Sequence, residues 1–164
     1  MSQIAGLYVV PDSAIDAIRK AALPQKAGWF SKPEDTFWQT LWMHAGPDRL
    51  EFGWSGYAFV VLFEYLRDRT LFDVEACENA ELARFLSKAR QSYFLTFTPS
   101  QSKEFARWLA AAQLEEDDVR QYVIEFCGPD EHETMVTATV NAAKILPRAL
   151  EGIREGTIAL MSIG

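Results

Sequence analysis

The pattern of apolar and polar positions is most regular at the end of the chain. After Gly156 the residues are apolar and partly β-branched, and no charged residue follows. The large apolar side chains in this run are Ile158, Leu160, Met161 and Ile163. Because a frayed chain end would leave these side chains in water, residues 157–164 are predicted to form a strand buried in a sheet. Residues 4–10 and 92–97 are short, apolar and β-prone, and they predict two further strands.

The clearest helix start lies immediately after the second predicted strand. Thr98 can act as the N-cap, Pro99 fits the first helical position because its missing N–H is not needed there, and Gln101 can close a capping box. The same spacing of cap residues recurs at Thr36 and Gln39. Caps and apolar spacing together predict helices over residues 12–23, 36–44, 55–69, 78–90 and 115–127.

The last helical stretch before the terminal strand contains Pro147, which is expected to break the helix or to restart it after Lys144. The order of elements is therefore strand, helices, strand, helices, strand. This order predicts one domain over residues 1–164 of the α+β (or α/β) class. We expect a small sheet of about three strands, which includes the N- and C-terminal strands and is covered by several helices.

Three segments stand in an informative order. They are the strand at Ile4–Tyr8 with the helix after it, the strand-to-helix corner at Leu95–Gln101 followed by a face of Phe105, Trp108 and Leu109, and Leu146–Gly164, where a helix runs directly into the last strand. Together they resemble the YfbM-like family of bacterial proteins, a domain family of unknown function. The resemblance implies the fold and a cytosolic bacterial origin. It supplies no active-site residue, and residues 29–90 depart from it most.

The charge of the chain limits its partners. Lys and Arg number 16 and Asp and Glu 23, so the formal net charge is −7, and the isoelectric point is about 4.9. Such a chain lacks the basic field that attracts phosphates, which argues against binding to nucleic acid or to an anionic membrane surface. The longest apolar run, residues 56–66, is interrupted by Glu64 and is too short to span a membrane. A basic protein partner is compatible with this charge.

Cysteine use and the N-terminal residues both predict a cytoplasmic protein. Cys77 and Cys127 are far apart and neither belongs to a CxxC motif. Buried or partly buried thiols are therefore expected, rather than a disulfide framework or a zinc site. Residues 1–4 do not show the basic region and apolar core with which a signal peptide begins.

The sequence motifs do not predict catalysis, a metal site or a cofactor. His132 does not belong to an HExxH zinc motif, because Val136 stands four residues after it. Ser55 does not belong to a GxSxG nucleophile elbow, because Tyr57 stands where the second glycine is required. The sequence also has no glycine-rich loop of the kind that binds phosphate. The sequence leaves open whether the protein is an enzyme and favours one that is not, and we expect no catalytic residue, no metal site and no cofactor.

Aromatic residues crowd one part of the chain. Four of the five tryptophans lie between Trp29 and Trp54, and the inner two, Trp38 and Trp42, are one turn apart on a predicted helix. Phe37 and Trp38 diverge by about 100° on that helix, so one narrow face cannot bury both. Either the helix is nearly surrounded by the protein, or aromatic surface is exposed. An aromatic core, a binding surface and a small-molecule pocket all stay open at this point.

The leading hypothesis is a non-enzymatic cytosolic domain of the regulatory or immunity type that binds a protein partner through aromatic surface. It predicts that Trp38, Trp42 or Trp54 is exposed, with acidic residues beside it. The alternative is a small-molecule-binding protein or an enzyme with a pocket near residues 44–57, and a third hypothesis is a homodimer that buries the aromatic patch. The candidate binding residues are Trp38, Trp42, His44, Arg49, Glu51, Trp54, Ser55 and Tyr57. The small-molecule alternative requires His44, Arg49, Glu51, Ser55 and Tyr57 to converge.

Overall fold

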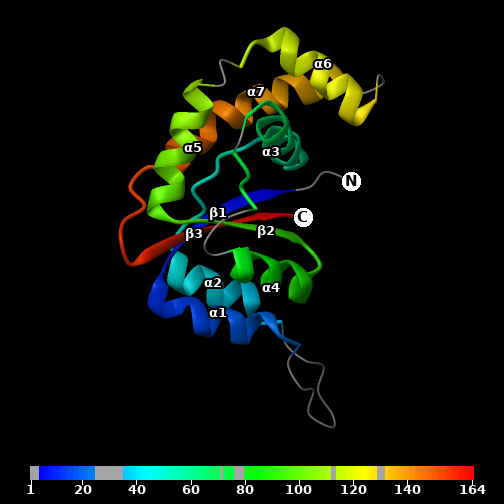
Figure 1. Cartoon of the computed structure of the whole chain (residues 1–164). Helices are drawn as coiled ribbons and strands as arrows, with labels where there is room; N and C mark the ends of the chain where they lie inside the picture. Colours follow the sequence, from blue (N-terminus) through cyan, green and yellow to red (C-terminus); the bar gives the residue numbers. More distant parts are fainter. Residues whose placement is uncertain (1–3, 25–34, 71, 76–79, 112–113, 129–131) are drawn as a thin grey trace.

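The computed structural model describes residues 4–24, 35–70, 72–75, 80–111, 114–128 and 132–164. Within these residues, three strands form one sheet among seven α-helices and one short 3-10 helix (Figure 1). In chain order the elements are β1 (Ala5–Pro11), η1 (Asp12–Ala14), α1 (Ile15–Ala22), α2 (Phe37–Ala45), α3 (Tyr57–Arg69), α4 (Ala80–Arg90), β2 (Tyr93–Phe97), α5 (Pro99–Ala111), α6 (Glu116–Cys127), α7 (His132–Ala149) and β3 (Thr157–Ile163).

The C-terminal strand β3 is the centre of the sheet. The strand order is β1-β3-β2, and both neighbours pair antiparallel with β3. The register places Met161 between Leu7 of β1 and Leu95 of β2. Every residue of β3 from Ile158 to Ile163 is buried. The strand predicted from the terminal apolar run is therefore confirmed, and the antiparallel pairing makes the fold α+β.

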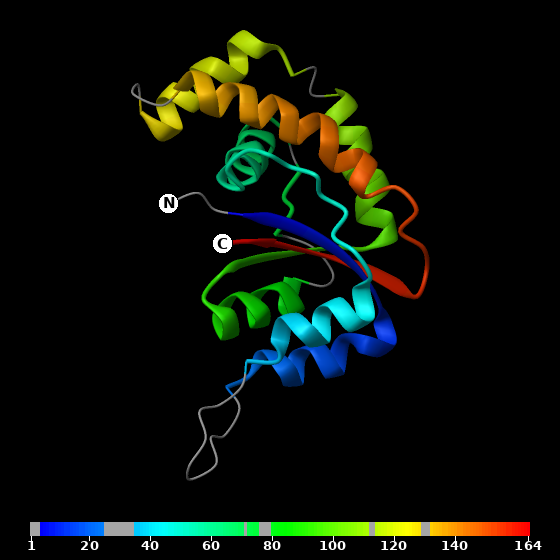
Figure 2. The same cartoon turned by 180° about the vertical axis from the view of Figure 1, so that it is seen from behind.

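Helices cover both faces of the sheet, because successive side chains of a strand point to opposite faces. Leu7 and Met161 face a core shared with α3, α5, α6 and α7. Tyr8 and Leu160 face a second core shared with α1, α2 and α4. Figure 1 shows the sheet between these two helical layers, and Figure 2 shows the same arrangement from behind. We call α1, α2 and α4 the lower helical layer and α3, α5, α6 and α7 the upper one, and we name the core on each side after its layer. The prediction of a small sheet covered by several helices is confirmed.

The outer edges of β1 and β2 are hydrogen-bonded by other parts of the chain. On β1, the N–H of Leu7 donates to Asp48 Oδ1 at 2.8 Å, and the carbonyl of Leu7 accepts from the N–H of Arg49 at 2.9 Å. On β2, the N–H of Phe94 donates to Ser87 Oγ at 2.9 Å, and the Ser87 hydroxyl donates to the Phe94 carbonyl at 3.4 Å. These bonds occupy backbone groups that would otherwise be open to pairing with a further strand.

The two predicted capping boxes have different outcomes. In the first, the N–H of Thr98 donates to Gln101 Oε1 at 2.7 Å and the N–H of Gln101 donates to Thr98 Oγ1 at 3.3 Å, as predicted. Thr36 does stand at the N-cap of α2, but its side chain makes no capping bond. The N–H of Phe37 donates instead to Asp35 Oδ1 at 3.1 Å. The box predicted at Thr36 is wrong, because the preceding carboxylate is a stronger acceptor than a hydroxyl for the free N–H groups of the first turn.

Helix α7 does not break at its proline. It runs from His132 to Ala149 with Pro147 inside it, so the break expected after Lys144 is wrong. Leu146 and Ala149 are buried, and their packing holds the last turn of the helix against the core. The fixed φ of proline is compatible with a helix, and near the end of the helix its missing N–H removes only one bond.

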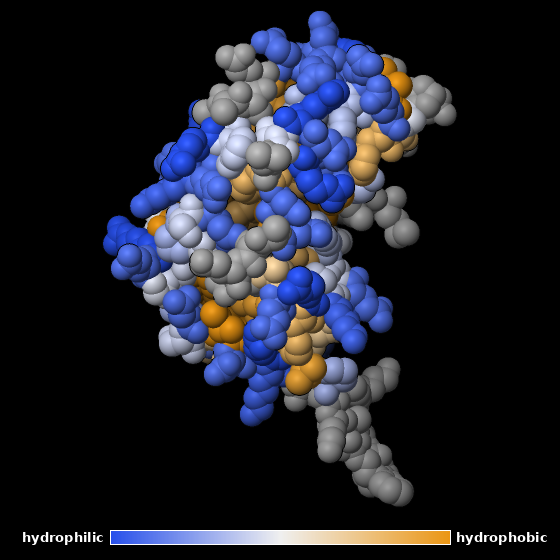
Figure 3. All heavy atoms as spheres, in the orientation of Figure 1, coloured by the Kyte–Doolittle hydropathy of each residue, from blue (hydrophilic) through white to orange (hydrophobic). Residues whose placement is uncertain are grey.

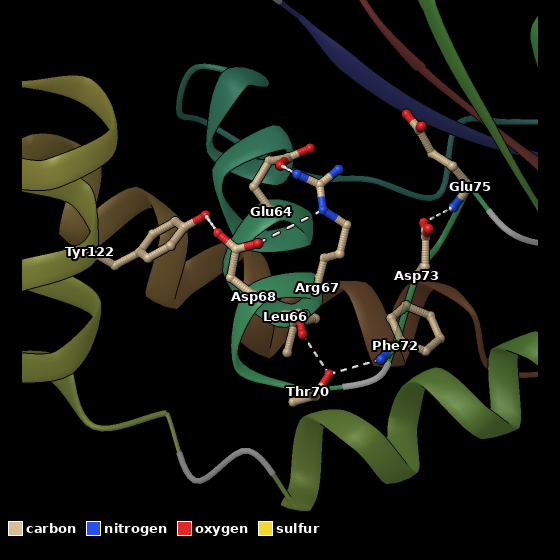
Figure 4. A network of polar contacts seen from close by, with 9 residues as sticks. All are labelled: Glu64, Leu66, Arg67, Asp68, Thr70, Phe72, Asp73, Glu75 and Tyr122. Atoms are coloured by element: carbon tan, nitrogen blue, oxygen red, sulfur yellow. Dashed lines mark hydrogen bonds and ion pairs between the residues drawn. The ribbon is translucent and has the colours of Figure 1, made fainter.

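Helices α3 and α6 are joined by two reciprocal hydrogen bonds between tyrosine and aspartate. Tyr65 of α3 donates to Asp118 of α6 at 2.6 Å, and Tyr122 of α6 donates to Asp68 of α3 at 2.9 Å. The two tyrosine rings meet edge to face with their centroids 5.3 Å apart. Figure 4 shows Tyr122 pointing to Asp68, which also forms an ion pair with Arg67. These contacts hold α6 against α3, and α6 lies farther from the sheet than α3 does (Figure 1).

Most of the face seen in Figure 3 is hydrophilic, and hydrophobic side chains come to the surface over the lower helical layer. None of the described helices is long and apolar enough to cross a membrane. Cys127 is exposed, so the expectation of a buried or partly buried thiol is wrong for this residue. The reason is its position: Cys127 is the last residue of α6 and lies beyond the buried positions Val119, Tyr122 and Val123.

Candidate binding site

Two of the predicted residues, Trp38 and Trp42, line a groove of about 370 Å³ near the end of the sheet where β1 begins and β3 ends. We call this groove the aromatic groove. Tyr8 of β1 is its third aromatic side chain, and Gly6 and Ser162 belong to the same face of the sheet. The remaining lining residues are Ile4, Ser92 and Gly164. The groove therefore combines aromatic walls with small and hydroxyl-bearing residues.

Trp38 lies at the centre of the aromatic cluster. Its ring centroid is 6.2 Å from that of Tyr8 and 6.3 Å from that of Trp42. It also packs against Phe37 at 5.1 Å and against Phe94 at 6.4 Å. Trp38 is half-buried, whereas Phe37 and Phe94 belong to the core between the sheet and the lower helices. This packing holds the Trp38 ring in place, so α2 presents a pre-formed aromatic wall.

Trp42 is the exposed part of the groove. Its exposed fraction is 56%, and that of Met43 beside it is 71%. The side chain of Trp42 lies close to that of Tyr8 in the same groove. Burial raises the pKa of the Tyr8 hydroxyl, while the Trp42 side chain opposes this shift and the charge of Asp48 adds to it. Tyr8 therefore stays a neutral phenol at physiological pH and can donate or accept hydrogen bonds.

Trp54 and Glu51 lie in a different cavity, of about 390 Å³, between residues 51–54 and helix α7. We call this cavity the Trp54 groove. Helix α7 contributes Asn141, Lys144, Ile145 and Arg148 to its lining. The exposed fraction of Trp54 is 42%. The prediction that Trp38, Trp42 or Trp54 is exposed is therefore confirmed for two of the three.

The other four predicted residues, His44, Arg49, Ser55 and Tyr57, are absent from the linings of both grooves. The N–H of Arg49 donates to the carbonyl of Leu7 in β1, and the guanidinium of Arg49 donates to the carbonyl of Glu151 at 3.0 Å. The Ser55 hydroxyl oxygen accepts from the N–H of Tyr57 at 3.3 Å, but the N-cap of α3 is Gly56, so the cap predicted at Ser55 is wrong by one residue. Tyr57 is half-buried, and burial raises its pKa. His44 is exposed in the last turn of α2.

A third cavity, of about 350 Å³, lies between helix α4, strand β2 and residues 74–75. We call it the α4–β2 pocket; its residues are absent from the candidate binding residues predicted from the sequence. One face of α4 contributes Ala80, Ala83, Arg84, Ser87 and Lys88, and β2 contributes Tyr93, Phe94 and Leu95. The Tyr93 hydroxyl donates to Glu75 Oε1 at 2.5 Å. Burial first, and then this hydrogen bond and the Glu75 charge, raise the pKa of Tyr93 far above its ordinary value.

The sequence contains only a weak signal for the α4–β2 pocket. The predicted inward face of α4, Leu82, Phe85, Leu86 and Ala89, does pack into the lower core. The pocket lies along the neighbouring face, where small side chains alternate with Arg84 and Lys88. That composition is typical of a solvated helix face. It becomes part of a cavity only because residues 74–75 and β2 fold next to it.

The five side chains that the small-molecule alternative requires do not converge in the structure. Glu51 lines the Trp54 groove. The other four residues do not line the aromatic groove, the Trp54 groove or the α4–β2 pocket. The physical reason is the path of the chain between α2 and α3, which passes the edge of β1 from the lower helical layer to the upper one (Figure 2). Because His44, Arg49 and Tyr57 stand at different points of this crossing, their side chains belong to different surroundings.

Three residues discussed from the sequence, Trp29, Cys77 and the side chain of His132, lie outside the described part of the structure. Across the described ranges, no group of three or more His, Cys, Asp or Glu side chains is arranged to hold a metal ion.

In comparisons with known proteins, no family model, curated protein or solved structure matches the chain. The resemblance of three segments to the YfbM-like family therefore stays a prediction.

Proposed function

We propose that this protein is a cytoplasmic, non-enzymatic binding domain of the regulatory or immunity type, and that the aromatic groove receives a side chain of a protein partner. The proposal rests on Trp42, whose indole is 56% exposed beside a groove of about 370 Å³. Tryptophan is among the residues that contribute most binding energy when a partner covers them, because a large apolar surface leaves water at little cost in side-chain entropy.

The fixed positions of the groove walls support the same function. Phe37 and Phe94 hold Trp38, and the Trp38 ring packs against that of Trp42 with the centroids 6.3 Å apart. Side chains that are already ordered before binding lose less entropy when a partner arrives. The net charge of −7 further favours a partner with a basic surface, because opposite charge speeds association and excludes acidic competitors.

The test compares alanine substitutions of two tryptophans that are both solvent-exposed. Immobilised wild type, Trp42→Ala and Trp54→Ala are each incubated with a lysate of the cells that encode the protein, after circular dichroism has verified their folding. We expect one partner to be retained by wild type and by Trp54→Ala, to be lost from Trp42→Ala, and to elute with salt. Equal retention by Trp42→Ala, or no specific retention by wild type, rules the proposal out.

A second copy of the chain is the competing occupant of the aromatic groove. Size-exclusion chromatography with light scattering separates the two cases. A dimer that Trp42→Ala dissociates would assign the groove to self-association, as in the homodimer hypothesis. A monomer at all concentrations, combined with loss of the retained partner in Trp42→Ala, supports a heterologous partner.

The pocket of five converging side chains that was expected near residues 44–57 is not formed, but the Trp54 groove favours a different small-molecule site, between residues 51–54 and α7. There the exposed indole of Trp54 and the carboxylate of Glu51 lie opposite Lys144 and Arg148 of α7. An apolar ring between opposite charges suits a small ligand that carries both an aromatic part and charged groups. A ligand found by thermal-shift screening should lose its effect in Trp54→Ala and keep it in Trp42→Ala. The opposite result would contradict binding in the Trp54 groove.

A further inference from the structure

The α4–β2 pocket is separate from both tryptophan grooves and has an apolar interior. Its lining includes the buried residues Val74, Ala80, Ala83, Phe94 and Leu95. Because Ala80 and Ala83 are small, α4 does not fill the space beside β2, and a cavity of about 350 Å³ is left. Concave, mostly apolar cavities of about this size are typical of small-molecule sites.

Two cations border this apolar interior. Arg84 and Lys88 are one helical turn apart on α4, and both line the pocket. Within the described part of the chain, neither of them forms an ion pair. The described lining thus carries two cations and one carboxylate, Glu75, and the charges of Glu64 and Asp73 also act on Tyr93. Two neighbouring cations beside an apolar cavity favour an anionic head group on an apolar ligand.

The carboxylate in the described lining already has a hydrogen-bond donor. Glu75 accepts from the Tyr93 hydroxyl at 2.5 Å, and the raised pKa of Tyr93 keeps that hydroxyl protonated at physiological pH. The charge of Glu75 is thereby partly satisfied by its neighbour on β2. Arg84 and Lys88 are then available to an incoming anion.

The backbone next to the pocket is also satisfied, which bears on the kind of ligand. The Ser87 hydroxyl bonds both the N–H and the carbonyl of Phe94 on the outer edge of β2. A peptide that added a strand to β2 would have to displace Ser87 from both groups. A small molecule that enters the apolar cavity has no such cost, so the pocket favours a small molecule over a peptide strand.

We propose that the α4–β2 pocket binds a small amphipathic carboxylate, with its apolar body against Ala83, Phe94 and Leu95 and its carboxylate at Arg84 and Lys88. This site shares no lining residue with the aromatic groove, and the proposal does not rest on the protein partner proposed above. The ligand is a non-covalent occupant, and no reaction is attributed to the pocket.

Decanoate and the uncharged decanol are the two probes for this proposal. Isothermal titration calorimetry with wild type should give saturable binding of decanoate, at an affinity above that of decanol. In the double variant Arg84→Gln with Lys88→Gln, we expect decanoate binding to weaken about three- to tenfold, while decanol binding stays the same. Absence of saturable decanoate binding to wild type, or equal affinity for both probes, would overturn the proposal.

Helix α5 supplies a matched control for the loss of two charges. Lys103 and Arg107 are exposed, are one turn apart, and do not belong to the pocket lining. The double variant Lys103→Gln with Arg107→Gln loses the same net charge and should bind decanoate as wild type does. If it weakens binding to the same degree as the α4 double variant, the effect comes from total charge and the pocket is not the site.

The location of the ligand is tested by filling the cavity. Ala83→Leu places additional carbon atoms at a lining position of the pocket, and decanoate binding should be lost from this variant once circular dichroism has verified its folding. Amide resonances of wild type provide a second measurement that does not depend on this variant. Decanoate should shift the amides of Phe94 and Leu95 and leave the Trp42 indole N–H unchanged. Shifts centred on Trp42 would place the ligand in the aromatic groove instead.

Discussion

The ring of Tyr8 lies over Gly6, two residues earlier on the same face of β1. A Cβ atom at residue 6 would stand 2.7 Å from the Tyr8 hydroxyl oxygen and 2.9 Å from the ring carbon Cε2. Real Cβ contacts are longer than this, so only glycine leaves room for the ring. The position of Tyr8 beside Trp38 and Trp42 thus depends on the absence of a side chain at residue 6.

Replacing Gly6 with alanine should therefore disturb the aromatic groove as well as the stability of the sheet. We expect Gly6→Ala to force the Tyr8 ring away from Trp38 and to lower the free energy of unfolding by about 1–3 kcal/mol, as for other overpacked sites. Urea unfolding and the near-ultraviolet circular dichroism of the tryptophans measure the two effects. The double variant Gly6→Ala with Tyr8→Leu is the control, because removal of the ring should recover most of the loss. A double variant as unstable as the sum of its parts would show that the ring is not the cause.

The stability of the protein should fall at alkaline pH because of the tyrosines between α3 and α6. Burial first, and then the bond to Asp118, raise the pKa of Tyr65 from 10.0 to about 12. In the unfolded chain Tyr65 loses its proton near pH 10, so between pH 10 and 12 the unfolded state binds fewer protons than the folded state. Unfolding is then increasingly favoured as the pH rises, and the contribution of Tyr65 is fully present only below pH 10.

The measurement is the midpoint of urea unfolding as a function of pH from 8 to 12. We expect a decline above pH 10, and a shallower decline in Tyr65→Phe, which has no proton to lose. The raised pKa of Tyr122 has the same sign, so the decline should persist in part in this variant. An identical slope in wild type and Tyr65→Phe would contradict the role given to Tyr65.

Asp48 is expected to stabilise the protein by closing the edge of β1. One of its carboxylate oxygens accepts from the N–H groups of Leu7 and Leu50, at 2.8 and 2.9 Å. Asp48→Ala leaves both donors without this acceptor and should lower the free energy of unfolding by about 1–3 kcal/mol. Asp48→Asn keeps an acceptor oxygen at the same position, so its loss in chemical denaturation should be smaller. A loss as large in Asp48→Asn as in Asp48→Ala would assign the effect to the charge instead.

Deletion of residues 157–164 should abolish the fold, although these residues are at the end of the chain. Strand β3 pairs with both β1 and β2, and its buried side chains belong to both cores. Without it, the two remaining strands have no partner between them and the two helical layers lose their shared sheet. Thermal unfolding followed by circular dichroism should show no cooperative transition. A cooperative transition near that of wild type would show that the terminal strand is dispensable.

The predictions that succeeded rest on signals contained within a few neighbouring residues. Thr98 and Gln101 form their capping box because both partners lie in the same first turn. The box at Thr36 failed for an equally local reason, since Asp35 offers a competing carboxylate to Phe37. At Pro147 the local signal was overridden by packing of the last helical turn on the core.

For the candidate binding residues, signals from neighbouring residues in the sequence predicted only part of the site. The sequence placed Trp38 and Trp42 one turn apart, which was enough to predict aromatic surface on that helix. It did not indicate that Tyr8 would become the third aromatic wall, because Tyr8 reaches the groove only through the pairing of β1 with β3. It placed Trp54 with the other tryptophans, whereas the crossing of the chain past β1 carries Trp54 to α7.

The sequence by itself determined the three strands, most of the helices and the burial of the chain end, because periodicity and caps act over a few residues. The central position of β3, the division of the predicted site into two grooves and the α4–β2 pocket were decided only by the tertiary structure. Each of these depends on segments that are distant in the chain and are brought together by strand pairing. Arg84 and Lys88 border a cavity for that reason, since Glu75 and β2 fold against the face of α4 that carries them.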